Sequence, residues 1–161
     1  MSQIKPALQD FFPFWDKLEP EHQKKLTKSC VLQHFRKGDT IATKDRQCMG
    51  LLLIQTGQLR ALILSEGGKE ITLYRLYELD ICLFSAACIM RNIQFDIQIE
   101  VETDTDAFVL PPVLYDRLSR ESALMANYTN ELMASRFSNV MWTLEQILFK
   151  SLDSRLAGAL L

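Results

Sequence analysis

Hydrophobic and polar residues alternate strictly over residues 93–102, which read IQFDIQIEVE. The apolar members are Ile93, Phe95, Ile97, Ile99 and Val101. Because successive side chains of a strand point to opposite faces, the alternation predicts a strand with one face in a core and the other in water. The next segment, TDTDAFVLP at 103–111, predicts a turn and a last strand. The acidic residues of 100–106 are therefore expected on a solvated strand edge and turn.

Two further strands are predicted on either side of a hairpin turn. Residues 51–64 (LLLIQTGQLRALIL) and 71–77 (ITLYRLY) have the composition of strands, and SEGGKE at 65–70 has that of a turn. Gly57 interrupts the first strand and indicates a bulge or a sharp bend. The strand pattern begins at Val31, and glycines divide the chain after it into short strands, which favours a jelly roll or a sandwich.

Helical patterns lie on both sides of the strands. Residues 1–30 predict helical structure, in which Pro20 begins a short polar helix. An apolar cluster precedes it and contains Phe11, Phe12, Phe14, Trp15 and Leu18. After the strands, LYDRLSRES predicts one short helix that breaks near Ser119 to Ser122.

The longest helical pattern covers residues 122–149 and carries two apolar stripes. The first has the alternating spacing of a coiled-coil seam: Ala126, Asn130, Met133, Phe137, Val140, Leu144 and Ile147. The second contains Leu124, Tyr128, Leu132, Met141 and Leu148. Two stripes need two covering surfaces, so we expect one to pack on the chain's own barrel and the other to form a homodimer. Asn130 is the polar seam residue that could fix the pairing. The alternative is an amphipathic helix that only covers its own sheet.

The last segment, SLDSRLAGALL at 151–161, predicts the start of a new apolar helix. A helix this short cannot bury its leucines alone. We therefore expect the native protein to continue beyond this chain.

Composition and charge exclude several classes of protein. The chain has 161 residues and a net charge of −2, with no run of Lys or Arg, so this segment is not expected to bind nucleic acid by itself. No apolar stretch has the length of a membrane span, and the N-terminus lacks the pattern of a secretory signal. A cytoplasmic protein with four reduced cysteines is the simplest expectation.

Three stretches together resemble the effector domain of the CRP/FNR family of bacterial transcription regulators. They are KGDTI at 37–41, the glycine-spaced strands from 51 to 76, and the long helix that leads into RLAGALL. The resemblance implies a mainly β fold with flanking helices: a double-stranded β-helix jelly roll, similar to cyclic-nucleotide-binding domains, followed by a long dimerisation helix. It also implies an effector site between barrel and helix, and DNA binding through a C-terminal domain absent from this chain.

This resemblance divides the chain into four parts. Residues 1–30 form an N-terminal helical segment and 31–112 the jelly-roll effector domain. Residues 113–150 contain the short helix and the dimerisation helix. Residues 151–161 are expected to begin the missing winged helix-turn-helix domain.

The phosphate-binding residues of the cyclic-nucleotide-binding members are replaced in LDICLFSAACIM at 79–90 and beyond. Leu79 replaces the glycine that usually precedes the aspartate, kept here as Asp80. Leu83 and Phe84 stand at the family's glycine and ribose-binding glutamate, and Phe95 and Asp96 at its arginine and serine. A buried phosphate needs a paired guanidinium. We therefore do not expect the domain to bind cyclic AMP or cyclic GMP well.

The resemblance still implies a pocket between the strands, the 82–88 turn and the long helix. Its expected lining is Leu73, Arg75, Leu83, Phe84, Ser85, Phe95, Ile97, Tyr128, Thr129 and Asn130. These side chains suit a small organic effector better than a phosphate. The alternative is a filled barrel that binds no ligand.

Two other classes of function are weighed against the regulator. Cys82 and Cys88 could form a redox switch, but no cation lies within 79–90 to stabilise a thiolate, so buried, inert thiols are favoured. A cupin-type metalloenzyme needs paired histidines on strands, and the chain has only His22 and His34. We expect no metal, no cofactor and no catalytic residues.

Overall fold

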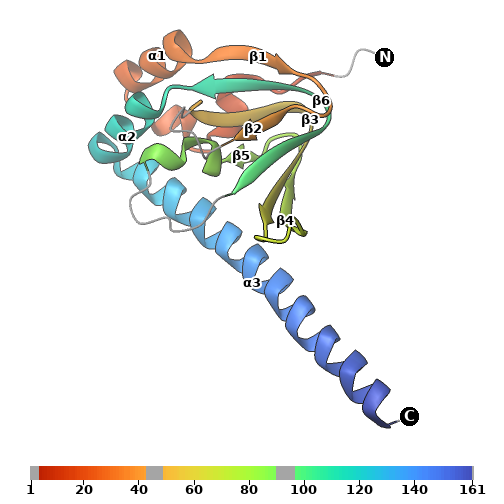
Figure 1. Ribbon diagram of the computed structural model, residues 1–161. Coiled ribbons are helices and arrows are strands. Elements are labelled where there is room, and N and C mark those ends of the chain that lie inside the picture. Colours follow the sequence, from red (N-terminus) through yellow and green to blue (C-terminus); the bar gives the residue numbers. More distant parts are fainter. Residues whose placement is uncertain (1–3, 43–48, 90–96, 161) are drawn as a thin grey trace.

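The computed structural model describes residues 4–42, 49–89 and 97–160, which fold into a strand-rich body with helices on one side and a long projecting helix (Figure 1). The helical elements before the strands are η1 (Leu8–Phe11), η2 (Trp15–Lys17) and α1 (Pro20–Ser29). The strands are β1 (Val31–Phe35), β2 (Thr40–Ala42), β3 (Leu51–Leu64), β4 (Glu70–Leu76), β5 (Ile81–Cys82) and β6 (Gln98–Leu110). The remaining helices are η3 (Phe84–Ile89), α2 (Pro112–Glu121) and α3 (Ala123–Leu160). The predicted arrangement of antiparallel strands with flanking helices and a long last helix is confirmed.

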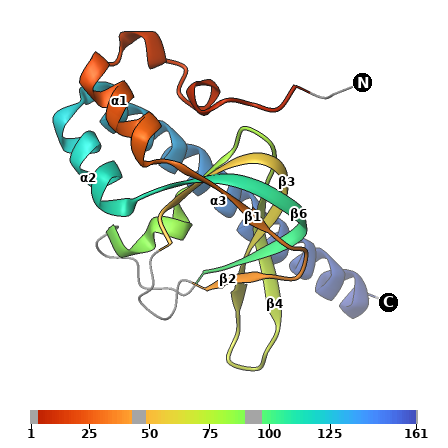
Figure 2. The ribbon, with the colours of Figure 1, turned by 90° about the horizontal axis from the view of Figure 1, so that it is seen from above.

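The two longest strands, β3 and β6, pair with each other over most of their length and form the spine of the sheet. β6 pairs on its other side with β1 and then β2, while β3 pairs with β5 and then β4. Every pairing is antiparallel. The half that carries β4 turns away from the half that carries β1 (Figures 1 and 2). The two halves enclose the barrel interior.

β6 corrects two expectations for residues 100–106. The predicted turn at 103–106 is absent, because β6 continues through it to Leu110. The acidic residues also do not lie on a sheet edge, since β6 has partners on both sides. Their charges are offset across the strands instead. Arg60 pairs with Glu100 and with Glu70 at 2.8 Å, and Arg75 Nε lies 3.0 Å from Glu102.

Gly57 marks the bend predicted in β3. Its φ is 98°, and the register with β6 shifts on both sides of it. A Cβ at this position would lie 2.5 Å from the carbonyl oxygen of Asp104 and 2.7 Å from the Cα of Thr105. Only glycine combines this backbone conformation with so close an approach of two strands. The bulge turns β3 from the helix-covered half of the sheet into the half that carries β4.

The sheet has a separate hydrophobic core on each side. The barrel interior contains Leu52, Ile54, Leu59, Leu76 and Val101, among others. The opposite side packs against α2, the start of α3 and the N-terminal aromatic cluster, through Leu51, Leu53, Ile81 and Leu110. The first residues of β3 are buried on both faces, which explains their unbroken apolar run. The N-terminal cluster forms as predicted, with Phe11, Phe12 and Leu18 buried.

The long helix differs from its prediction in length and in its second stripe. α3 runs without a break to Leu160, so the prediction of a new helix at 151 is wrong. Leu124, Tyr128 and Leu132 do pack on the chain's own body. Met141 and Leu148 do not, because nine residues of an α-helix place Met141 about half a turn away from Leu132. Both side chains are exposed, on a helix whose C-terminal part projects from the body (Figure 1).

Candidate functional site

One face of α3 holds the helix against β4 and the open end of the barrel. Val140 packs on the barrel core, and the hydroxyl of Thr143 donates to the carbonyl oxygen of Leu73 at 3.0 Å. Arg136 lies one turn before Val140 on the same face and is buried. These three side chains fix where the helix meets the barrel. We call this contact the barrel–helix junction.

Arg136 brings a positive charge into this junction. Its Nη2 lies 3.4 Å from Oδ1 of Asp80, and its Cζ lies 5.0 Å from the centre of the Tyr74 ring. The Tyr74 ring in turn lies 6.1 Å from that of Phe84, at the start of η3. The junction therefore combines a guanidinium, a carboxylate and two aromatic rings from four separate elements of the chain.

Two polar atoms of the junction lack partners. Arg136 Nε and the Tyr74 hydroxyl are buried, and neither has a hydrogen-bond partner among the described residues. Burial raises the pKa of Tyr74 far above its usual range, and the nearby Cys82 raises it further. The phenol is therefore neutral at physiological pH and keeps its proton as a hydrogen-bond donor.

A tight turn over Tyr77–Asp80 holds Asp80 in place. Its amide donates to the carbonyl oxygen of Tyr77 at 2.9 Å, and its Oδ2 accepts from the Tyr77 amide at 2.8 Å. Leu79, third in the turn, has a φ of 70°, the left-handed conformation that such a turn demands and that favours glycine. Leu79, at the position where the resemblance places a glycine, therefore adopts a conformation that favours glycine.

Leu79→Gly is expected to stabilise the chain by about 1 kcal/mol, because a side chain in the left-handed region costs about 1–2 kcal/mol. Glu78→Gly is the matched control. Glu78 lies next to Leu79, is exposed and has no positive φ. The added backbone freedom of a glycine there should therefore destabilise the fold by roughly 0.5–1 kcal/mol. Urea denaturation of both variants measures the difference, and equal losses of stability would contradict a strained turn.

The structure divides the predicted pocket lining between its two cores. Leu73, Phe84 and Ile97 lie together in the barrel interior. Leu83 is buried in the other core, against the helices. Ser85 is buried between them, where its hydroxyl donates to the carbonyl oxygen of Cys82 at 2.7 Å.

The predicted residues on α3 and β4 lie apart from this group. The hydroxyl of Tyr128 donates to the carbonyl oxygen of Phe11 at 2.8 Å, and Thr129 is hydrogen-bonded to Tyr115, so both contact the helical layer. Arg75 is exposed and Asn130 is exposed. Phe95 lies outside the described residues.

Tyr74 and Arg136, the two junction residues with unpartnered atoms, were absent from the sequence-based lining. A signal for Arg136 does exist. It is the one charged side chain on a helix face whose other members are Met125, Thr129, Leu132, Val140 and Thr143. A single charge on an otherwise uncharged, inward face needs a partner, and this spacing could have indicated the site.

The thiols that the structure describes are in conditions that disfavour reactivity. Cys82 is fully buried, and its burial raises the pKa of the thiol. Burial likewise raises the pKa of the Cys30 thiol to about 12. The side chain of Cys88, the second cysteine of the redox hypothesis, lies outside the described residues. The described residues also contain no group of three His, Cys, Asp or Glu side chains placed to hold a metal ion.

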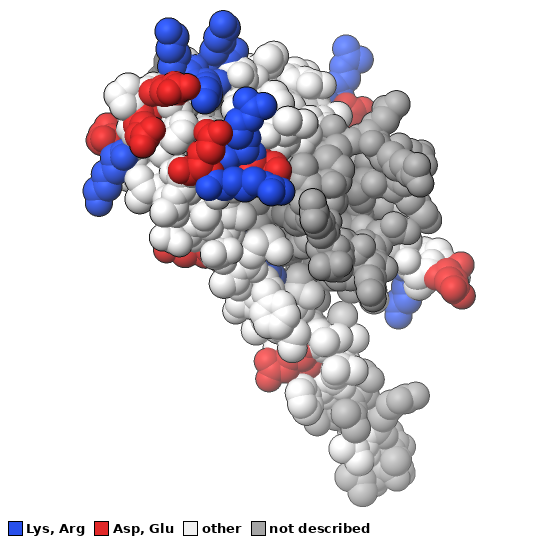
Figure 3. Space-filling view, turned by 90° about the vertical axis from the view of Figure 1, so that its left-hand side faces the viewer, with Lys and Arg blue, Asp and Glu red and all other residues white. Residues whose placement is uncertain are grey.

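The projecting half of α3 carries an exposed apolar surface next to the junction face. Of the predicted seam, Phe137 is 69% exposed, and Asn130, Met133, Leu144 and Ile147 are also exposed. Ala126 and Val140 are half-buried, Val140 against the barrel. In the view of Figure 3 the described side chains of this projecting half are mostly uncharged, while Lys, Arg, Asp and Glu side chains gather over the helical layer.

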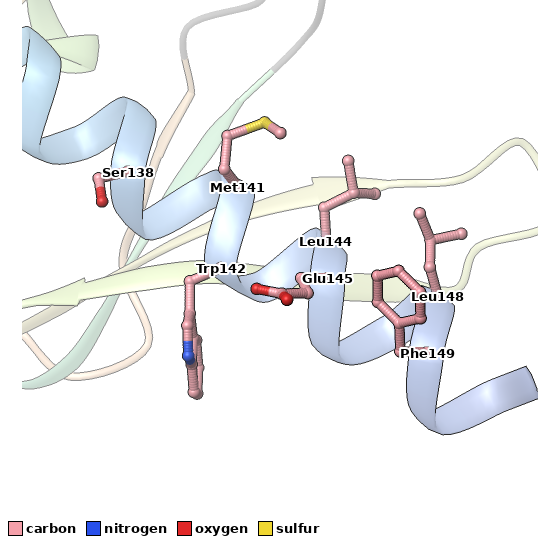
Figure 4. A pocket seen from close by; sticks show the side chains of 7 residues that line it. All are labelled: Ser138, Met141, Trp142, Leu144, Glu145, Leu148 and Phe149. Atoms are coloured by element: carbon pink, nitrogen blue, oxygen red, sulfur yellow. The ribbon is translucent and has the colours of Figure 1, made fainter. Parts of the chain in front are cut away.

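Side chains of α3 between Ser138 and Phe149 line a groove of about 490 Å³. Met141, Leu144 and Leu148 project to one side of α3, and Trp142 points away from them (Figure 4). Trp142 is 63% exposed and Phe149 is 60% exposed, which is unusual for aromatic side chains of this size. None of the described helices has both the length and the apolar character needed to span a membrane.

Comparison with solved structures relates the chain to transcription regulators. A chain from Eubacterium rectale, described as a transcriptional regulator of the Crp/Fnr family, is 51% identical, with a TM-score of 0.83 over 94% of this chain and 70% of that chain. A mutant of CooA from Carboxydothermus hydrogenoformans is 18% identical, with a TM-score of 0.65 over 99% of this chain and 100% of that chain. The catabolite activator protein of Thermus thermophilus is 21% identical, with a TM-score of 0.64 over 87% and 63%. The last two show the shared fold alone. No protein-family model and no curated protein matches the sequence.

Proposed function

Because the chain belongs to the CRP/FNR family of transcription regulators, which are not enzymes, we propose that it senses a small organic effector at the barrel–helix junction and dimerises through α3. The observation that carries the proposal is the arrangement of α3. One face is fixed to the barrel through Arg136, Val140 and Thr143, and the adjacent apolar face is exposed. A single helix therefore lies at both the sensing site and the dimer interface.

A second copy of the chain is the proposed partner of the exposed face. The proposed stripe differs from the predicted seam, because Val140 packs on the barrel. The exposed apolar positions Met133, Phe137, Met141, Leu144 and Leu148 follow each other at intervals of four and three residues. This spacing keeps them on one side of the helix, as in a coiled-coil seam. Two such helices would cover each other's stripe. Asn130 lies at the barrel end of the seam, where its side chain could fix the register of the two helices.

The proposed effector is not a cyclic nucleotide. Phe84 fills the place that the resemblance gives to a ribose-binding glutamate, and its side chain packs beside Tyr74 in the barrel interior. Leu83, at the family's glycine, is buried in the other core. An effector that binds one helix arrangement better than another would shift the population of dimer states. We propose that the protein binds DNA through a C-terminal domain outside this chain. We also propose that the protein acts in the cytoplasm.

Sedimentation equilibrium and calorimetric titration test the proposal on the 161-residue chain. We expect a dimer at micromolar protein concentration and no saturable heat on addition of millimolar cyclic AMP. A monomer at this protein concentration would contradict the dimer, and saturable binding of cyclic AMP at micromolar concentration would contradict the proposed effector class. Each result bears on a separate half of the proposal.

A further inference from the structure

The barrel–helix junction contains two buried hydrogen-bond donors without acceptors. Among the described residues, neither Arg136 Nε nor the Tyr74 hydroxyl has a partner. Each of the two residues is only 8% exposed, so solvent does not readily replace the missing partner. Buried polar groups of native proteins are nearly always paired, and exceptions call for a bound group or a functional role. The two donors come from α3 and from β4, and Cζ of Arg136 lies 5.0 Å from the centre of the Tyr74 ring.

Asp80 satisfies only part of the Arg136 guanidinium. Its Oδ1 lies 3.4 Å from Nη2, while its Oδ2 already accepts from the amide of Tyr77. The side chain of Asp80 is 35% exposed, so water shares its charge. Nε–H, on the side edge of the planar guanidinium, therefore remains available to a second acceptor.

The charges and the neighbouring rings select the class of ligand. Arg136 supplies one positive charge, which Asp80 already offsets in part. A dianionic phosphate would therefore add more uncompensated buried charge than a monoanion, and a monoanion with two acceptor oxygens can accept from both free donors. The rings of Tyr74 and Phe84 lie 6.1 Å apart beside these donors and favour an aromatic body on the ligand.

We propose that the barrel–helix junction binds a small aromatic carboxylate, whose oxygens accept hydrogen bonds from Arg136 Nε and from the Tyr74 hydroxyl. The inference rests on the proposed function and specifies the chemical class of its effector. Such a ligand joins α3 to β4 through one carboxylate. It thereby favours the helix position in which both donors face it, which is the differential affinity that an effector needs.

Isothermal titration calorimetry on the 161-residue chain tests this ligand class with four probes: benzoate, phenylacetate, the neutral isostere benzamide and inorganic phosphate. We expect saturable binding of at least one carboxylate. Benzamide should bind at least about tenfold more weakly than benzoate, because it lacks the charge that strengthens hydrogen bonds to arginine. Phosphate should bind more weakly than the carboxylates.

Two variants connect the binding to the named donors. Arg136→Met keeps an apolar stem and removes the charge, and Tyr74→Phe keeps the ring and removes only the hydroxyl. Each should weaken carboxylate binding, Arg136→Met by at least about tenfold. Arg120→Met is the matched control, since the Arg120 side chain on α2 is 68% exposed and far from β4 in the fold (Figure 1). It should leave carboxylate binding unchanged.

Several results would overturn the inference. These are the absence of binding by both carboxylates, equal binding of benzoate and benzamide, tighter binding of phosphate, or unchanged binding in Tyr74→Phe and Arg136→Met. Sedimentation of the same samples separates this failure from that of the proposed function. A dimeric chain that binds neither carboxylate refutes the effector class alone, whereas a monomer contradicts the proposed dimer whatever the ligand does.

Discussion

Phe137→Glu is expected to convert the dimer into monomers by weakening association about 100-fold or more, since a disrupted interface hot spot costs about 2–4 kcal/mol. Phe137 is the most exposed of the large apolar side chains that the structure describes on α3, at 69%. In the proposed dimer its ring would be covered by the partner helix. A glutamate there would place an unpaired charge in an apolar seam. Sedimentation equilibrium over a range of protein concentrations measures the change.

Ser135→Glu is the matched control for this substitution. Ser135 is exposed and lies two residues before Phe137, which places it on the other side of the helix. It adds the same charge without entering the seam, so the dimer should persist. If Phe137→Glu sediments as the unaltered chain does, the dimer interface does not use this stripe of α3. Far-ultraviolet circular dichroism of both variants checks that the helix is retained.

Gly57→Ala is expected to destabilise the fold by about 2–5 kcal/mol, which is a large part of the stability of an ordinary domain. The new methyl group would meet the backbone of Asp104 and Thr105 at 2.5 Å and 2.7 Å, as well as the Thr105 hydroxyl. β3 and β6 would have to separate at the point where both bend. The positive φ of 98° adds the cost of a left-handed alanine.

Gly38→Ala separates the cost of the backbone conformation from that of the steric clash. Gly38 has a φ of 91°, and a Cβ there would meet nothing within 4 Å. Its substitution should therefore cost only about 1–2 kcal/mol. Urea denaturation of the two variants gives the difference. Losses of the same size would show that the strands at Gly57 can separate at little cost.

Local sequence patterns located some elements correctly and others only in part, for identifiable reasons. The bounds of β3 were predicted correctly because a long apolar run ends at an unambiguous glycine turn. β6 was divided wrongly at TDTD because polar residues usually indicate a turn. In the fold, Asp104 accepts from the Lys37 amide at 2.8 Å, and Asp106 accepts from Lys5 at 2.9 Å. These partners come from distant parts of the chain, so no local pattern could reveal them.

The predicted lining of the candidate site is divided between two cores and the helical layer, and it did not include Tyr74 or Arg136. The family resemblance implied a site between barrel and helix, and that position stays a prediction. Tyr74 and Arg136 were missed because their contact depends on how α3 crosses β4. Helical periodicity separates the stripes of α3 but does not say which stripe meets the barrel. Three-dimensional contacts decide that: Arg136 and Val140 face the barrel, whereas Phe137 faces away from it.

The unbroken course of α3 from Ala123 to Leu160 has a mechanical consequence. No proline or glycine lies between Arg136 and Ala157, so this part of the helix has none of the usual causes of a sharp kink. At about 1.5 Å per residue, Leu160 lies roughly 35 Å beyond Arg136 along the axis. When a straight helix tilts about its contact with the barrel, the residues at its C-terminal end move the most. A tilt too small to break the contact of Thr143 with β4 therefore becomes a displacement of several ångströms at Leu160.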